Sequence, residues 1–199
     1  MNLFPLIMEH MYIVLLSIAI SAFIGIFLGV AAYWVKPAAP LMMGLAEAIQ
    51  TIPSLALLAM LMIFFGLGNA TMIAGLVLYS LLPIMRNTHT GLTSVSQSVK
   101  DAAKGMGMSK VQQLLQVELP LSFPLIFSGL KIALVNALSI AVMGVLIGAG
   151  GLGYPIYRGI QTRQIDRILT GALPVVLMAL LFDALMSKVE QRLSKRGQS

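Results

Sequence analysis

The sequence predicts an all-α integral membrane protein, and its composition and the grouping of its apolar residues lead to that fold class. Of its 199 residues, 58% are hydrophobic and 10% are charged, whereas soluble domains contain roughly 45–50% apolar and about 25% charged residues. The apolar residues also form long runs separated by short charged segments. So few polar groups could not cover the surface of a soluble fold. We therefore expect residues 1–199 to form a single membrane domain.

Five apolar runs are long enough to cross a bilayer, for which a helix needs roughly 20 apolar residues. The first run has no charged residue and is too long for a secretory signal peptide, so it is expected to be an uncleaved membrane helix. The third run is the shortest and ends at Arg86. The predicted helices cover approximately residues 11–35, 41–65, 71–86, 123–147 and 168–187.

Basic residues predict the orientation of these helices. The segment between the third and fourth runs, residues 87–120 together with Arg86, carries four of them, and so does the C-terminal tail. Short basic segments stay on the cytoplasmic side of a membrane. The N-terminus is therefore expected outside the cell and the C-terminus in the cytoplasm. This distribution also accounts for the net charge of +6 without nucleic-acid binding.

The residue types exclude several kinds of chemistry. The chain has no Cys and two His, too few for a metal cluster. No nucleophile–base pair or phosphate-binding loop is visible. The pattern G-x-G-x-x-G at residues 148–153 follows an apolar run instead of a strand, so it predicts a tight turn and not a dinucleotide site. We expect no catalytic residue, metal site or cofactor in this chain.

Small residues recur every four positions in the first helix. Such a ridge lets a second helix approach closely where lipid provides no hydrophobic driving force. Ordinary packing within the chain is the expected use. The ridge consists of Ser17, Ser21, Gly25 and Gly29.

Polar residues within the second and fourth runs indicate a path for a solute. Glu47, Gln50, Thr51 and Ser54 have the spacing of one helix face, and Pro53 is expected to kink that helix. Polar groups in hydrocarbon are costly unless they face protein or water. A buried structural network is the alternative. The predicted path comprises Glu47, Gln50, Thr51, Pro53, Ser54, Asn136 and Ser139, and Lys131 is expected to extend to the cytoplasmic interface.

The polar segment between the third and fourth runs is expected to fold as two short helices. An apolar stripe of Leu92, Val95, Val99 and Met106 predicts the first. Ser109 and Gln112 form the capping-box pattern at the start of the second. Gly105 and Gly107 lie at the junction and predict a sharp turn that approaches another molecule closely. The segment is therefore a candidate docking element.

The residue pattern of this segment resembles a known family. Asp101-Ala102-Ala103, Gly107, Val117 and Leu119-Pro120 resemble the cytoplasmic "EAA" loop of binding-protein-dependent ABC importer permeases. Asp replaces the usual Glu and Val the usual Ile, and both changes are conservative. The segments 47–54, 104–109 and 148–153 are similar to permeases for osmoprotectants such as glycine betaine, carnitine, choline and proline betaine.

The resemblance implies a type I ABC importer permease, multi-pass in the bacterial cytoplasmic membrane. It implies two cytoplasmic ATPase subunits that hold ATP and Mg²⁺, a second permease subunit that is either a copy or a related chain, an external substrate-binding protein, and surrounding lipid. The chain itself would be a transport subunit and not an enzyme. The implied ATPase contact consists of Asp101, Ala102, Ala103, Lys104, Gly105, Met106, Gly107, Met108 and Ser109.

Three arginines are unusual on the external side, and they lie in the segment 154–167. They suggest a contact with acidic groups of the binding protein through Tyr154, Arg158 and Arg163. Two other functions stay open at this point. One is an ABC permease for another small solute, such as an amino acid. The other is an ion-coupled transporter that uses Glu47 and Asp183.

Overall fold

The computed structural model describes residues 2–196, which contain helices and turns but no strand. Four helices are long and apolar enough to cross a membrane, and a bent pair of shorter helices makes a fifth crossing possible. The predicted all-α membrane class is therefore confirmed for these residues. The long helices are α1 (Phe4–Trp34), α4 (Asn69–Ser94), α7 (Leu119–Ala141) and α9 (Ile165–Arg196).

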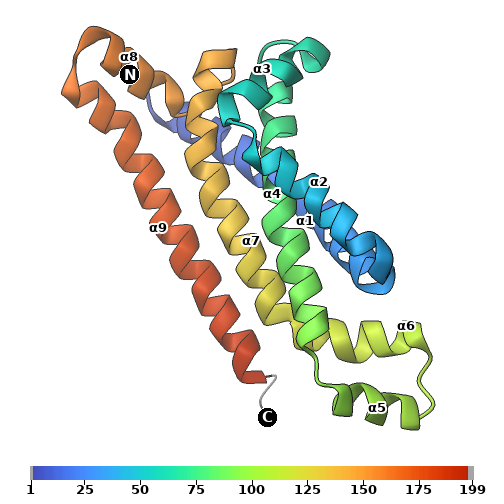
Figure 1. Cartoon of the computed structure of the whole chain (residues 1–199). Coiled ribbons are helices and arrows are strands. Elements are labelled where there is room, and N and C mark those ends of the chain that lie inside the picture. Colours follow the sequence, from blue (N-terminus) through green and yellow to red (C-terminus); the bar gives the residue numbers. More distant parts are fainter. Residues whose placement is uncertain (1, 197–199) are drawn as a thin grey trace.

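The core of the bundle lies where α4 packs between α1 and α7, while α9 covers α7 (Figure 1). The ridge predicted in α1 faces α4, as expected for packing within the chain. A Cβ atom added to Gly25 would lie 2.9 Å from a methyl carbon of Ile84, and one added to Gly29 would lie 2.6 Å from Cβ of Thr88. The two helices therefore approach closely only because these positions lack side chains.

The second predicted helix is broken and does not form a single kinked span. A short 3₁₀ turn, Lys36–Ala38, leads into helix α2 (Ala39–Thr51). Helix α3 (Ser54–Phe65) follows, and the chain bends by 101° between the two helices. Ile52 is extended because a residue before proline is pushed out of the helical region. The expectation that Ser54 shares a helix face with Glu47 is therefore wrong, since Ser54 begins the next helix.

Several predicted boundaries were too narrow. Helix α4 has 26 residues and continues to Ser94, so the third crossing is not short, and residues 87–94, Leu92 included, belong to it instead of the docking segment. Helix α1 begins at Phe4 and α9 runs to Arg196. The cause is the same for these three helices. An apolar run marks only the part of a helix that lies in hydrocarbon, whereas the helix itself continues into polar residues beyond it. Residues 1 and 197–199 of the predicted domain lie outside the described residues.

The two ends of the bundle carry different short elements. At the end near the C-terminus, α5 (Gln97–Gly105) and α6 (Lys110–Gln113) project from the bundle (Figure 1). A π-helical turn, η2 (Leu114–Glu118), then leads into α7. At the end near the N-terminus, a 3₁₀ segment, η3 (Val142–Ile147), leads to α8 (Gly153–Thr162). The predicted fourth run, 123–147, thus combines α7 with η3.

Candidate functional sites at the two ends and the exposed faces of the bundle

The predicted docking segment consists of α5, a tight turn and α6. The backbone N–H of Ser109 donates to Oε1 of Gln112 at 2.8 Å, and the N–H of Gln112 donates to Oγ of Ser109 at 3.3 Å. This reciprocal pair confirms the predicted capping box. It fixes the start of α6 and therefore the direction in which the chain leaves the turn.

The turn at Gly107 projects away from the rest of the chain. Gly107 has φ of +80°, which favours glycine, and a Cβ atom added there would meet nothing within 4 Å. Met106 beside it is 71% exposed, whereas Ala103 on α5 is 2% exposed and faces the chain. The turn therefore presents backbone to solvent while α5 stays anchored through its inner face.

Lys100 links α5 to two membrane helices. Its Nζ donates to the hydroxyl of Tyr33 at 2.9 Å and to the backbone oxygen of Leu92 at 3.2 Å. Tyr33 lies at the end of α1 and Leu92 near the end of α4. These two hydrogen bonds therefore tie α5 to the ends of both helices.

Two of the predicted path residues of α2, Glu47 and Gln50, are attached to α4, whereas the hydroxyl of Thr51 donates to the backbone oxygen of Ala48 in α2 itself. Glu47 forms an ion pair with Arg86, and Nε2 of Gln50 donates to the backbone oxygen of Tyr79 at 3.1 Å. The hydroxyl of Tyr79 donates to the backbone oxygen of Ile52, at the break between α2 and α3. Tyr79 and the role of Arg86 at this site were not evident from the sequence, because their partners lie on another helix.

Asn136 and Ser139 lie on an exposed face of α7, between Ile132 and Met143. Ser139 donates to the backbone oxygen of Val135 in its own helix, at 3.4 Å. Among the described residues, no hydrogen bond joins this pair to Glu47 or Gln50. The structure thus places the predicted path residues on different helices, with Glu47 and the half-buried Gln50 on α2 beside α4 and with Asn136 and Ser139 on α7.

The glycine-rich turn at 148–153 encloses the carboxylate of Glu9. Gly148 and Gly151 have φ of +73° and +97°, which confirms the predicted tight turn. Oε2 of Glu9 accepts from the N–H of Gly151 at 3.2 Å, and Oε1 accepts from Nδ2 of Asn69 at 3.1 Å. Oδ1 of Asn69 accepts in turn from the N–H of Gly150 at 2.9 Å. This network joins the beginnings of α1 and α4 to the turn.

A hollow of about 380 Å³ lies beside α8 and α9 at the same end of the bundle, lined by Tyr154, Pro155, Arg158, Arg167 and Thr170. The guanidinium of Arg158 is 6.0 Å from the centre of the Tyr154 ring. Arg163 ends α8 with φ of 54° and does not line the hollow. Arg167 lines the hollow instead of Arg163, because α9 turns back over α8. Arg167 was expected outside the cell but was not among the residues predicted to contact the binding protein.

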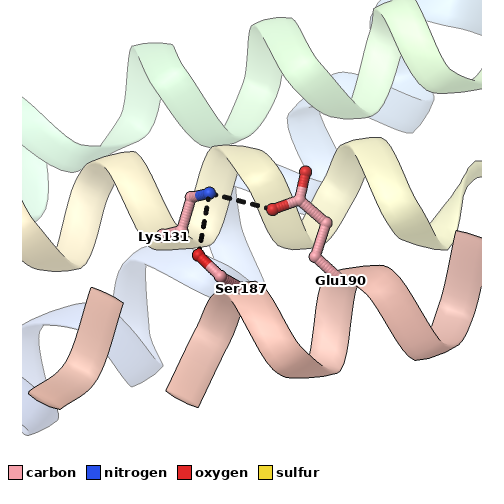
Figure 2. A network of polar contacts seen from close by, with 3 residues as sticks. All are labelled: Lys131, Ser187 and Glu190. Atoms are coloured by element: carbon pink, nitrogen blue, oxygen red, sulfur yellow. Dashed lines mark hydrogen bonds and ion pairs between the residues drawn. The ribbon is translucent and has the colours of Figure 1, made fainter. Parts of the chain in front are cut away.

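A polar contact also joins α7 and α9 (Figure 2). Nζ of Lys131 donates to Oε2 of Glu190 at 2.9 Å and to Oγ of Ser187 at 3.4 Å. The sequence predicted only that Lys131 extends to the cytoplasmic interface, since nothing in the spacing links it to a residue in the last helix.

The architecture matches one known family along nearly its whole length. The family described as "Binding-protein-dependent transport system inner membrane component" matches residues 5–195. The chain belongs to this family. It is therefore an inner membrane component of a transport system, in agreement with the predicted membrane location and with the resemblance drawn from the docking segment.

Relatives of this inner membrane component are similar over most of both chains. The glycine betaine/carnitine/choline transport system permease protein OpuCD of Bacillus subtilis is 43% identical, over 94% of this chain and 82% of the relative. The carnitine transport permease protein OpuCD of Listeria monocytogenes is 42% identical, over 94% and 84%. The osmoprotectant import permease protein OsmW of Salmonella typhimurium is 36% identical, over 95% and 90%.

Solved transporters share the fold. The MetNI methionine ABC transporter in an inward-facing conformation aligns with a TM-score of 0.87 at 21% identity, over 96% of this chain and 95% of that chain. An amino acid ABC transporter aligns with a TM-score of 0.77 at 20% identity, over 94% of each chain. At such identities the likeness establishes the ABC importer permease fold alone.

Proposed function

We propose that this inner membrane component is the permease subunit of an ATP-driven importer for quaternary ammonium osmoprotectants such as glycine betaine, carnitine and choline. The observation that supports this solute class is the similarity, at 42–43% identity over 94% of the chain, to permeases named for these solutes. An amino acid as the solute has no comparable support, because the amino acid transporters are similar in fold alone.

The energy for transport would enter through the segment Asp101–Ser109, docked on a separate ATPase subunit that holds ATP and Mg²⁺. Two features support this role. A Cβ atom added to Gly107 would meet nothing within 4 Å among the described residues, so this side of the turn is accessible to a partner. The Lys100 contacts with Tyr33 and Leu92 connect the segment to α1 and α4. Movement of the ATPase would thus reach the membrane helices.

A second permease subunit, either a copy or a related chain, would complete the path. Asn136 and Ser139 are exposed on α7, and polar groups at membrane depth face protein or a water-filled cavity. A path between two subunits would place them, together with Glu47 and Gln50, beside the moving solute. Two ATPase subunits would then shift the two permease subunits from one relative arrangement to another. A few kcal/mol of differential binding to the two arrangements suffices for such a shift.

The external substrate-binding protein would dock on α8 and the start of α9. The hollow lined by Arg158 and Arg167 supports this site, because it offers two cationic groups and the ring of Tyr154 to an acidic side chain. Arg163 is exposed at the end of α8 and would lie at the margin of the contact.

A reconstitution experiment tests the proposal. The permease, co-expressed with its ATPase subunits, is placed in proteoliposomes with the binding protein, and uptake of labelled glycine betaine, carnitine, choline and methionine is compared. We expect uptake of the quaternary ammonium solutes that requires both ATP and the binding protein. Methionine uptake of equal rate would contradict the solute class, and uptake without ATP would contradict the ABC mechanism.

A further inference from the structure

Two adjoining hollows lie along the last turns of α1. The first is an apolar groove of about 380 Å³, and the second is a polar hollow of about 310 Å³. Phe23, Phe27 and Val30 line the groove, and Trp34 lines the polar hollow. Their spacing places them on one helix face. The two hollows are therefore successive parts of one surface that extends toward the end of α1.

The groove has an apolar lining throughout and opens on the outside of the bundle. Phe23 is 79% and Phe27 is 67% exposed. The opposite wall comes from η2 and the start of α7, through Leu114, Leu115 and Leu119. In a membrane protein such a wall faces hydrocarbon, and the groove offers room alongside α1 for an acyl chain.

The polar hollow gathers lysines from three separate elements. Lys36 comes from the 3₁₀ turn, Lys100 and Lys104 from α5, and Lys110 from α6. Asp101 and Glu118 are the acidic residues in its lining, so the lining has a net positive charge. Asp101 also accepts a hydrogen bond from Gln97 at 2.9 Å. The arrangement favours an anionic group.

The aromatic residues place this hollow at the level of lipid headgroups. Tyr33 and Trp34 end α1, and these residue types are enriched at the boundary between membrane and water. Nζ of Lys100 is held 2.9 Å from the Tyr33 hydroxyl and 5.1 Å from the centre of its ring. One of the lysines is thus oriented before any ligand arrives.

We propose that these hollows bind one anionic phospholipid of the cytoplasmic leaflet. Its phosphate group would contact Lys36 and Lys100, and an acyl chain would lie along Phe23, Phe27 and Val30. A soluble phosphate would use only the polar hollow, whereas a lipid uses both. The bound lipid would join the end of α1 to α5, whose residues Asp101 and Lys104 line the hollow and also belong to the segment that is proposed to dock on the ATPase. The proposal is independent of which solute the permease moves.

Native mass spectrometry of the delipidated full-length permease tests this site. The protein is titrated with phosphatidylglycerol and with phosphatidylcholine of the same acyl chains. We expect phosphatidylglycerol to bind about thirtyfold more tightly, at about fivefold for each net positive charge near the headgroup. The double substitution Lys36→Gln and Lys100→Gln should remove this preference. Lys36→Gln alone alters an exposed side chain and should reduce the preference about fivefold.

Matched variants separate the two hollows. Lys188→Gln with Arg192→Gln makes the same charge change on exposed residues of α9 outside both hollows, and it should keep the preference. Phe27→Ala should weaken both lipids equally, because it removes part of the groove and no charge. Glycerol phosphate, which lacks an acyl chain, should fail to displace the lipid at millimolar concentration.

Four results with the permease alone would overturn the proposal. The first is equal binding of the two lipids, and the second is an undiminished preference for phosphatidylglycerol in the Lys36 and Lys100 variants. The third is an equal loss of that preference in the α9 control, and the fourth is displacement of the lipid by glycerol phosphate. The measurement is repeated on the complex with the ATPase subunits. Exclusion of phosphatidylglycerol from that complex would assign the lysines to the protein interface instead of a lipid.

Discussion

Lys131 on α7 and Glu190 on α9 form an ion pair, with 2.9 Å between Nζ and Oε2. Their side chains are 23% and 29% exposed, and Ser187 shares the lysine (Figure 2). The rest of the contact between these helices is largely apolar, with Val175 and Met178 of α9 buried in the core. The pair therefore supplies a specific polar contact that fixes how α9 lies along α7.

Removal of one partner of this pair should destabilise the bundle. Glu190→Leu leaves an unpaired lysine in a partly buried place, and we expect a loss of about 1–3 kcal/mol in the free energy of unfolding. Adding Lys131→Met should restore most of that loss, since two apolar side chains then pack together. Thermal unfolding in detergent measures both. Lys188→Gln, an exposed change on the same helix, should alter stability by less than about 0.5 kcal/mol.

The turn at Gly107 should tolerate no side chain once a partner is bound. Gly107→Asp is expected to abolish solute uptake and co-purification of the ATPase subunits while the permease stays in the membrane. Gly66→Asp is the matched control, because Gly66 has φ of +73° and equally open surroundings at the other end of the bundle. It should leave ATPase co-purification intact. Wild-type uptake by the Gly107 variant would refute the docking assignment.

The hollow beside α8 should determine how well the external protein is recognised. Arg158→Glu with Arg167→Glu reverses both charges, so we expect the binding-protein concentration that gives half-maximal uptake to rise at least about tenfold, each lost charge pair contributing about 1 kcal/mol or more. Arg163→Glu, outside the hollow, should have a smaller effect. An unchanged concentration dependence in the double variant would remove this surface from the contact.

The carboxylate of Glu9 should be sensitive to a methyl group at Gly150. A Cβ atom there would lie within 2.0 Å of the carboxylate oxygens, so Gly150→Ala must displace Glu9 from its hydrogen bonds. We expect a loss of about 1–3 kcal/mol in unfolding free energy. In a Glu9→Ala background the same change should cost much less. Gly44→Ala serves as the control, since nothing lies within 4 Å of its added Cβ, and it should be neutral or stabilising.

The permease should bind its solute weakly. Tight recognition of a quaternary ammonium group calls for several aromatic faces, yet Trp34 lies at the end of α1 with the docking segment, and the tyrosines are scattered over several helices. We expect a dissociation constant no better than about 1 mM, equivalent to about −4 kcal/mol, by calorimetry on the permease complex without its binding protein. A micromolar constant would reveal an aromatic cage formed between subunits.

Local features of the molecule followed from the sequence because each depends on residues close together in the chain. Apolar runs located the four long membrane helices, although hydropathy alone did not place their polar ends, and the run 41–65 is the bent pair α2 and α3. The Ser109–Gln112 pair located the start of α6. Pro53 located the position at which the second run is interrupted, although a kink was predicted and the helix breaks there. The glycines at 148–153 located a turn. The docking segment indicated the family, since its motif lies within one short stretch of the chain.

Contacts between distant residues were decided only by the tertiary structure. Pro53 predicted a kink but not a break with an angle of 101°, which depends on how α3 packs on α4. Glu47 meets Arg86, Lys131 meets Glu190, and Lys100 meets Tyr33 across separations of 39, 59 and 67 residues. Spacing within one helix says nothing about which helix lies opposite. For the same reason Arg167 and the converging lysines became visible only when the helices were packed together.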